Sequence, residues 1–347
     1  MSYISIYKSI VARRILVLTM FLVLTFCLFL ADLCIGSSGI SPLVVLKALF
    51  SNSVSSVVHA IVWDFRLPWS LMAVIVGFAL GVAGAVMQII LNNPLASPYT
   101  LGISHGAGFG AAMVYALGIS ILGPLTKYVH YIVPINAFVF ALLTCALIMI
   151  IGKIRGFTYE TLILAGIAIS FLFSALLSLM EYFASEEALQ AIVFWLFGSL
   201  IKSSILKVEI VTAVTLVSLV VLLRYSWELV TLRLGDEKAR ALGVDPEKVR
   251  VVTMVVVAIL TAAAVCFVGI IGFVGLVAPH IARFLVGEDA RFLLPTSGLA
   301  GSIILSASAI AAKTILSGAI LPIGIVTSII GIPFFLYLVI RGRRGVW

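Results

Sequence analysis

The most constraining feature of this sequence is a succession of apolar runs, separated by short segments that contain most of the charged residues. The first run covers residues 15–35, and comparable runs recur to the end of the chain. A helix of about twenty apolar residues matches the hydrocarbon thickness of a bilayer. The runs therefore predict an all-α, polytopic membrane protein.

Composition supports the same class and excludes others. Of the 347 residues 63% are hydrophobic, and the mean hydropathy is +1.27. The net charge of +8 does not indicate nucleic-acid binding, because the basic residues are scattered between the runs rather than gathered into a patch. The four cysteines have no metal-ligand spacing, and we expect no disulfide framework.

The runs divide the chain into ten expected spans within a single transmembrane domain, residues 1–347. Glycines at positions 77, 81 and 84 have the spacing that lets two helices approach closely. The Gly-x-Gly pattern of residues 102–110 is also interpreted as helix packing rather than a phosphate loop, since no strand precedes it. The expected spans are 15–35, 66–91, 101 onward, 131–151, 161–180, 206–223, 251–268, a short and irregular 269–283, 298–316 and 323–340.

The distribution of lysine and arginine orients these spans. Most of the 22 basic residues fall in segments that this assignment places on one side, together with both termini. Basic residues favour the cytoplasmic side of a membrane. We therefore expect a multi-pass protein of the cell inner membrane with both termini in the cytoplasm. The basic residues on the other side are Lys47, Arg66, Lys127, Lys202, Lys207 and Lys313.

Residues 234–250 form a charged island between two apolar runs, with eight charged side chains among seventeen residues. Asp236 and Glu237 suit a helix N-terminus, and Gly243 suits a helix C-terminus. Asp245, followed by proline, is typical of a second helix start. The pattern predicts two short helices on the cytoplasmic surface that serve as a docking platform. An ordinary solvated loop is the alternative.

Two sequence features that are missing, a phosphate loop and acidic residues at mid-membrane, limit the functions that the chain could have. The sequence has no phosphate loop, because its only Gly-Lys pair, Gly152-Lys153, is followed by isoleucine and lacks the earlier glycine. The chain is therefore not expected to be an enzyme that hydrolyses ATP. Its acidic residues fall near the ends of spans rather than at mid-membrane. This disfavours an ion-coupled secondary transporter, which remains an alternative together with a structural membrane scaffold.

The histidines give few further candidates. His59 and His130 lie in expected outside segments, and His280 follows a proline, where it is expected to cap carbonyls that the kink frees. His105 begins a helix of small residues and is a candidate for lining a transport pathway.

Ten short motifs resemble, in their order and spacing, the permease subunits of bacterial and archaeal ABC importers for iron-siderophores, haem and cobalamin, known as type II importers. Any one of these motifs is a weak signal, whereas together they extend over nearly the whole chain. They are Arg66-Leu-Pro, Gly84-Ala-Val-Met-Gln88, Asn93-Pro-Leu-Ala96, Leu101-Gly-Ile-Ser104, Leu164-Ala-Gly166, Trp195-Leu-Phe-Gly-Ser199, Ala239-Arg-Ala-Leu-Gly243, Gly272 to Ile281, Leu321-Pro-Ile-Gly324 and Gly331-Ile-Pro-Phe334.

The resemblance implies the type II ABC importer permease fold and a set of partners. Two such subunits would form a dimer that binds two cytoplasmic ATPase subunits and an outside substrate-binding protein. ATP and Mg would be held by the ATPase, with no cofactor in this subunit. The charged island would supply the coupling helices at 234–250. The residues expected to couple to the ATPase are Asp236, Glu237, Ala239, Arg240, Leu242 and Gly243.

The resemblance also implies sites at both membrane faces. Arg66 and Lys313 correspond to positions that dock the binding protein, although Trp69 and Ala309 replace charged residues that are frequent in the family. The cytoplasmic gate corresponds to Thr158, Tyr159, Glu160 and Thr161.

The function that these patterns favour is ATP-driven import of a metal chelate, an iron-siderophore or haem, by alternating access. Import of cobalamin or of a molybdate-type oxyanion by the same mechanism is the alternative within the family.

Overall fold

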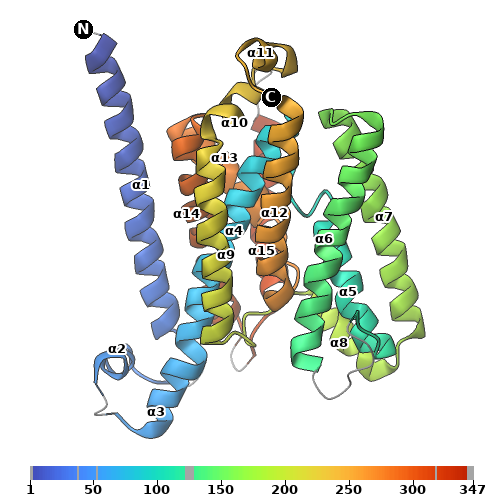
Figure 1. Cartoon of the computed structure of the whole chain (residues 1–347). Coiled ribbons are helices and arrows are strands. Elements are labelled where there is room, and N and C mark those ends of the chain that lie inside the picture. The colour runs from blue at the N-terminus through green and yellow to red at the C-terminus, as the bar shows by residue number, and fades with distance from the viewer. Residues whose placement is uncertain (1–2, 37–38, 52–53, 122–128, 317–318, 342–347) are drawn as a thin grey trace.

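The computed structural model describes residues 3–36, 39–51, 54–121, 129–316 and 319–341, and the side chain of His130 and all of Lys127 lie outside this description. The regular secondary structure of the described residues is entirely helical, without strands (Figure 1). The helices are α1 (Tyr3–Cys34), α2 (Pro42–Phe50), α3 (Ser56–Ala60), the π-helical η1 (Ile61–Arg66), α4 (Leu67–Ile90), α5 (Ile103–Leu117), α6 (Val129–Arg155), α7 (Tyr159–Phe183), α8 (Glu186–Leu196), α9 (Ile205–Arg224), α10 (Ser226–Leu232), α11 (Asp236–Ala241), α12 (Pro246–Val268), α13 (Val274–Val286), α14 (Ala290–Thr314) and α15 (Ile323–Arg341).

Seven helical stretches in the described residues are long and apolar enough to cross a membrane, which confirms a multi-pass, all-α protein. They contain α1, α3 to α4, α6, α7, α9, α12 and α14. The other three expected spans coincide with α5, α13 and α15. α13 has 13 residues and follows an irregular stretch in which Phe273 has a φ of 64°. The total of ten spans stays a prediction.

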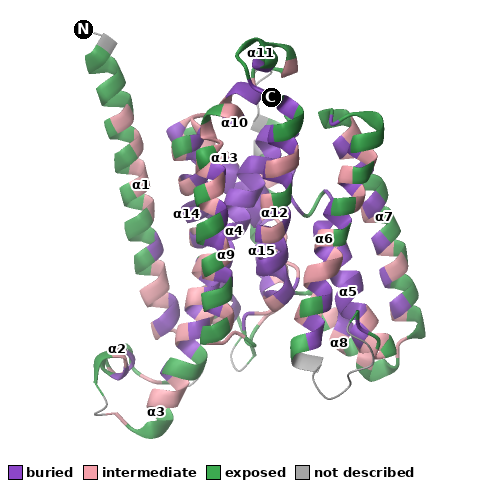
Figure 2. Ribbon diagram, viewed as in Figure 1, coloured by how far each residue is buried: buried purple, intermediate pink, exposed green. Residues whose placement is uncertain are grey.

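The core forms around α4, which is buried along most of its length (Figure 2). Its glycines lie against the backbones of α13 and α14. A Cβ on Gly81 would stand 2.1 Å from the carbonyl oxygen of Ser297, and one on Gly84 would stand 1.7 Å from that of Gly275. Only glycine permits such contacts. The predicted close helix packing is therefore confirmed.

A second group of helices, α5 to α8, lies beside this core (Figure 1). A Cβ on Gly110 of α5 would stand 2.6 Å from the carbonyl oxygen of Asn136 in α6. Nearby, Phe109, Phe140 and Phe173 join α5, α6 and α7, with ring centroids 5.1 Å apart for the first two. The interpretation of residues 102–110 as a packing helix is confirmed.

The helix α1 lies at the edge of the molecule and exposes much of its apolar surface (Figure 2). At the end near the N-terminus, Arg14 forms an ion pair of 2.9 Å with Asp289, which caps α14. At its other end α1 is held by buried polar contacts described below.

The short helices mark the two ends of the bundle. The N-terminal end of α1 and the helix α11 lie at one end, whereas α2, α3 and α8 lie at the other (Figure 1). This arrangement is the one expected if residues 234–250 and the N-terminus share a side of the membrane.

Candidate functional site

The charged island folds into one short helix, α11, followed directly by the start of the long helix α12. Gly235 and Gly243 flank α11 with φ angles of 95° and 81°, which favour glycine. After α11, the amide of Gly243 donates to the carbonyl of Arg240, and that of Val244 donates to Ala239. These two bonds form a Schellman motif that ends the helix, as the glycine predicted.

The second helix start in the island is the first turn of a membrane span. The Asp245 carboxylate accepts hydrogen bonds from the amides of Glu247 at 3.0 Å and Lys248 at 3.4 Å. The capping prediction is confirmed, but the prediction of two short helices within 234–250 is wrong. After Arg250 in the second turn, the helix continues through predominantly apolar residues, so α12 extends to Val268. The short helix that accompanies α11 is α10, which precedes it.

The residues of α11 and its C-cap, Leu242, divide into exposed and buried groups. Glu237 and Arg240 are exposed, and Leu242 exposes 54% of its surface although it is apolar. Ala239 is fully buried and packs within this subunit. A partner that binds α11 would therefore meet the first three side chains.

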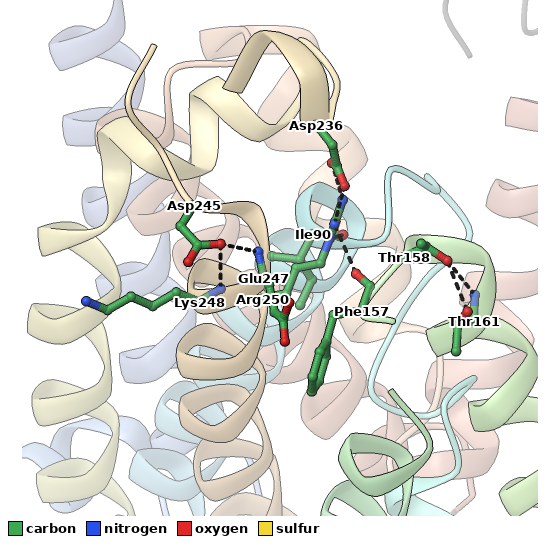
Figure 3. A network of polar contacts seen from close by, with 9 residues as sticks. All are labelled: Ile90, Phe157, Thr158, Thr161, Asp236, Asp245, Glu247, Lys248 and Arg250. Carbon is green, nitrogen blue, oxygen red and sulfur yellow. Dashed lines mark hydrogen bonds and ion pairs between the residues drawn. The ribbon is translucent and has the colours of Figure 1, made fainter. Parts of the chain in front are cut away.

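Arg250, in the second turn of α12, joins three segments that are distant in the sequence (Figure 3). Its Nη1 and Nη2 donate to the two carboxylate oxygens of Asp236 in α11, each at 2.7 Å. Its Nε donates to the carbonyl of Ile90 at 3.0 Å, and Nη1 also donates to that of Phe157 at 3.0 Å. We call these four residues the Arg250 node.

The node keeps a charged residue stable although Arg250 is only 3% exposed. The planar guanidinium matches the two carboxylate oxygens of Asp236, which compensates its charge. The carbonyl of Ile90 ends α4 and has no partner within that helix, so it suits a cationic donor. The hydrogen bond from Arg250 lowers the pKa of the Asp236 carboxyl below its ordinary value, despite partial burial.

The predicted gate residues begin directly after the node. The hydroxyl of Thr158 caps α7 by accepting a hydrogen bond of 3.3 Å from the amide of Thr161 (Figure 3). Tyr159 and Glu160 are exposed in the first turn of α7. The fold thus brings the coupling candidate Asp236 and the gate candidates to opposite sides of one arginine.

The predicted docking residues lie at the other end of the bundle and are buried. Arg66, 6% exposed, donates to the carbonyls of Leu33 at 3.2 Å and Cys34 at 2.9 Å. Lys313 donates to a carboxylate oxygen of Asp32 at 2.9 Å and to the Asp32 carbonyl at 3.1 Å. The two cations therefore hold the end of α1 against η1, which contains Arg66, and α14, which contains Lys313.

Two neighbours extend the contacts of this buried pair. Ser70 donates to the second carboxylate oxygen of Asp32 at 2.6 Å, and the Lys313 ammonium lies 4.5 Å from the centre of the Trp69 ring. Trp69 thus packs on the lysine.

His105 lies near a cleft of about 640 Å³ that the 95–100 loop forms with α13 and α15. Its ring contacts Tyr99, a lining residue, at a centroid distance of 5.1 Å. The Nε2 of His280 lies 2.9 Å from the carbonyl of Pro94, in the turn after α4, rather than at a carbonyl that the Pro279 kink frees. Within the described ranges, no group of three or more histidine, cysteine or acidic side chains could hold a metal ion.

Comparison with known proteins identifies the family. The model of the FecCD transport family matches residues 22–341. The chain belongs to the FecCD transport family. This FecCD chain is 40% identical to an ABC transporter permease protein of Methanocaldococcus jannaschii over 98% of both chains. It is 34% identical to the hemin transport system permease protein of Yersinia pestis, over 91% of this chain and 94% of the relative.

Other relatives show the breadth of the family. This FecCD chain is 39% identical to a vitamin B12 import system permease of Vibrio vulnificus, over 84% of this chain and 86% of the relative. Its fold is similar to that of a metal-chelate type ABC transporter in an inward-facing conformation. The TM-score is 0.81 at 32% identity, over 93% of this chain and 98% of the other. The protein is a membrane permease subunit of an ABC importer.

Arg250 is the residue of this FecCD permease that our sequence reasoning overlooked. From the sequence it is one of the eight charged residues of the island. A signal was present, because it is the last charge before an uninterrupted apolar run and therefore lies where a membrane span begins.

Proposed function

We propose that this permease imports a metal chelate, an iron-siderophore or haem, and that ATP hydrolysis by a separate ATPase drives the import. The relative of Yersinia pestis named for hemin transport supports haem, and a Bacillus subtilis permease named for iron(3+)-hydroxamate import, 34% identical over 90% of this chain, supports siderophores. Cobalamin is the alternative that the Vibrio relative supports. Import of a molybdate-type oxyanion has no such support among these relatives.

The observation that carries ATP coupling is the position of α11. An exposed helix is fixed at one end of the bundle through Asp236 and Arg250, in a chain that lacks a phosphate loop of its own. Glu237, Arg240 and Leu242 would contact the ATPase, whereas Asp236, Ala239 and Gly243 hold the helix in place. ATP and Mg would bind to the two ATPase subunits.

The remaining parts of the proposal follow the family. Two copies of this ten-span chain would form a central pathway, with both termini in the cytoplasm. A binding protein would deliver the substrate at the end of the bundle that contains α2, α3 and α8. Closure of the ATPases would displace α11 and switch the gate at Thr158 to Thr161 between inward- and outward-open states. His105 would lie close to the pathway.

The docking role of Arg66 and Lys313 takes an indirect form in this proposal. Both side chains are buried, so they would shape the binding-protein surface by fixing α1 to η1 and α14 rather than by contacting the binding protein.

Uptake into proteoliposomes tests the proposal. The permease, its cognate ATPase and its binding protein would be reconstituted and supplied with ATP and a ferric siderophore, haem, cobalamin or molybdate. We expect ATP-dependent uptake of a siderophore or haem. Uptake of cobalamin or molybdate alone would contradict the proposed substrate. Uptake that follows a proton or sodium gradient without the ATPase would identify a secondary transporter, and no uptake under any condition would favour a scaffold.

A further inference from the structure

The Arg250 node lies between the two parts of the permease that the proposed mechanism must connect. On one side Asp236 belongs to α11, and on the other Phe157 directly precedes Thr158, which caps α7. We infer that Arg250 is a positioning residue that transmits displacement of α11 to the start of α7. This inference rests on the proposed function.

The third contact of Arg250 attaches the node to the end of α4. Its Nε donates to Ile90, the last residue of α4, whose side chain is fully buried. Because α4 packs closely on α13 and α14 through its glycines, we take its end at Ile90 as the fixed partner of the node. A displacement at the node therefore falls on the two other partners, α11 and the segment before α7.

The Asp236 carboxylate and the Phe157 carbonyl accept from the same nitrogen. Nη1 donates to Asp236 at 2.7 Å and to Phe157 at 3.0 Å, while Nη2 donates to the other carboxylate oxygen of Asp236. The carboxylate is the stronger acceptor because it carries the charge. When α11 moves, the guanidinium group follows the carboxylate, and the bond to the Phe157 carbonyl is the one that lengthens.

The surroundings of Phe157 connect its hydrogen bond with Arg250 to the start of α7. Gly156 has a φ of 90°, so the chain turns sharply just before it, and a Cβ on Gly152 would stand 2.9 Å from the Phe157 ring. The ring is therefore held by α6, and the carbonyl is held by Arg250. Release of the carbonyl would free the backbone of residues 156–158. The Thr158 hydroxyl, which caps α7, would then move with this backbone. Displacement of α11 would thus switch the node from the arrangement described here to one in which the Phe157 carbonyl is released.

The first test uses the permease alone in nanodiscs and does not depend on any ATPase. Asp236→Asn keeps the shape of the side chain but removes its charge. The changed residue lies in α11, outside the segment in which exchange is measured. Hydrogen exchange of residues 157–162 should become about fivefold faster or more, as expected for a segment that opens locally. Lys248→Gln, an exposed charge change on the same helix as Arg250, should leave exchange in this segment within about twofold of the parent. Acceleration confined to α11 in the Asp236→Asn protein would overturn the inference.

Arg250→Lys provides the conservative comparison. Lysine keeps the positive charge but cannot bind Asp236 with two nitrogens and reach both carbonyls. We expect the same acceleration at residues 157–162 as in Asp236→Asn. Exchange equal to the parent would show that a positive charge at position 250 is enough to hold residues 157–162. It would overturn the role of the several guanidinium nitrogens. If Arg250→Lys does not fold, the Asp236→Asn experiment still decides.

A second test separates transmission from mere stability. In proteoliposomes with the ATPase and binding protein, substrate molecules imported per ATP hydrolysed should fall about tenfold in Asp236→Asn, while the ATPase still co-purifies and hydrolyses ATP. A structural defect would reduce uptake and hydrolysis in the same proportion, and that result would overturn the inference. If the parent binds no ATPase, the proposed function fails, whereas the exchange experiment still tests the link within the permease.

Discussion

At the residue scale, the buried polar contacts show how this membrane protein holds charges within an apolar bundle. Asp32 is fully buried, and the side chain of Lys313 is 5% exposed, so neither is solvated by water. Each depends on the other, and Ser70 satisfies the second oxygen of the carboxylate. Removing one partner of such a pair leaves an uncompensated buried charge.

Lys313→Met should therefore lower the free energy of unfolding by about 3–5 kcal/mol. The double variant Lys313→Met with Asp32→Asn should be less destabilised than the sum of the two single changes, because neither charge is then left unpaired. Thermal unfolding of the permease in detergent measures both effects. Additive changes would show that the two side chains do not depend on each other.

The ion pair of Asp236 with Arg250 gives a pH dependence with a definite sign. The pKa of Asp236 is lowered in the fold, so the stabilisation is fully present above the ordinary carboxyl pKa, about 3.9, and is lost as the pH falls through the lower folded value. We expect proteolysis of residues 234–250 to be unchanged between pH 8 and pH 5 and to accelerate below about pH 4. In Asp236→Asn this acid-induced acceleration should be absent, and its persistence would assign it to another group.

At the element scale, glycine decides how closely the core helices pack. A Cβ on Gly84 would stand 1.7 Å from a carbonyl oxygen of α13, whereas a Cβ on Gly272 would meet its nearest atom at 3.8 Å. The first contact cannot be relieved by rotating a side chain, since both partners are backbone.

Gly84→Ala should therefore destabilise the permease by about 1–3 kcal/mol or more, as overpacking does in other cores. Gly272→Ala should change stability little, because its Cβ would make an ordinary contact. Midpoints of thermal unfolding for the two variants test this contrast. Equal midpoints would mean that α4 and α13 can separate without loss.

At the scale of the whole molecule, the exposed apolar surface of α11 favours binding of another subunit. Leu242 is more than half exposed at the end of the bundle that is expected to face water. Leu242→Asp should reduce co-purification of the ATPase about tenfold or more, since a buried apolar contact would be replaced by a charge. The melting temperature of the permease alone should stay constant. Lys248→Gln is the matched control, and equal ATPase recovery from all three proteins would argue against this contact.

Much of the architecture was determined by the sequence itself. The apolar runs required membrane helices, because a bilayer leaves backbone groups no partner outside their own segment. Gly81 and Gly84 indicated close packing, and Gly243 and Asp245 indicated a helix end and a helix start, because these depend on local backbone geometry. The family followed from motifs whose order and spacing are properties of the sequence alone.

The roles of individual charges were decided only by the tertiary structure. The sequence around Arg66 and Lys313 does not show that the end of α1 packs over them. Nor does the sequence around Arg250 show that it contacts Ile90 and Phe157, which lie far away in the sequence. Electrostatic roles depend on which partners and how much water surround a side chain, and both are set by long-range packing. The sequence thus determined the helices and the family, whereas the fold alone decided that Arg250 faces inward and contacts both α11 and the segment before α7.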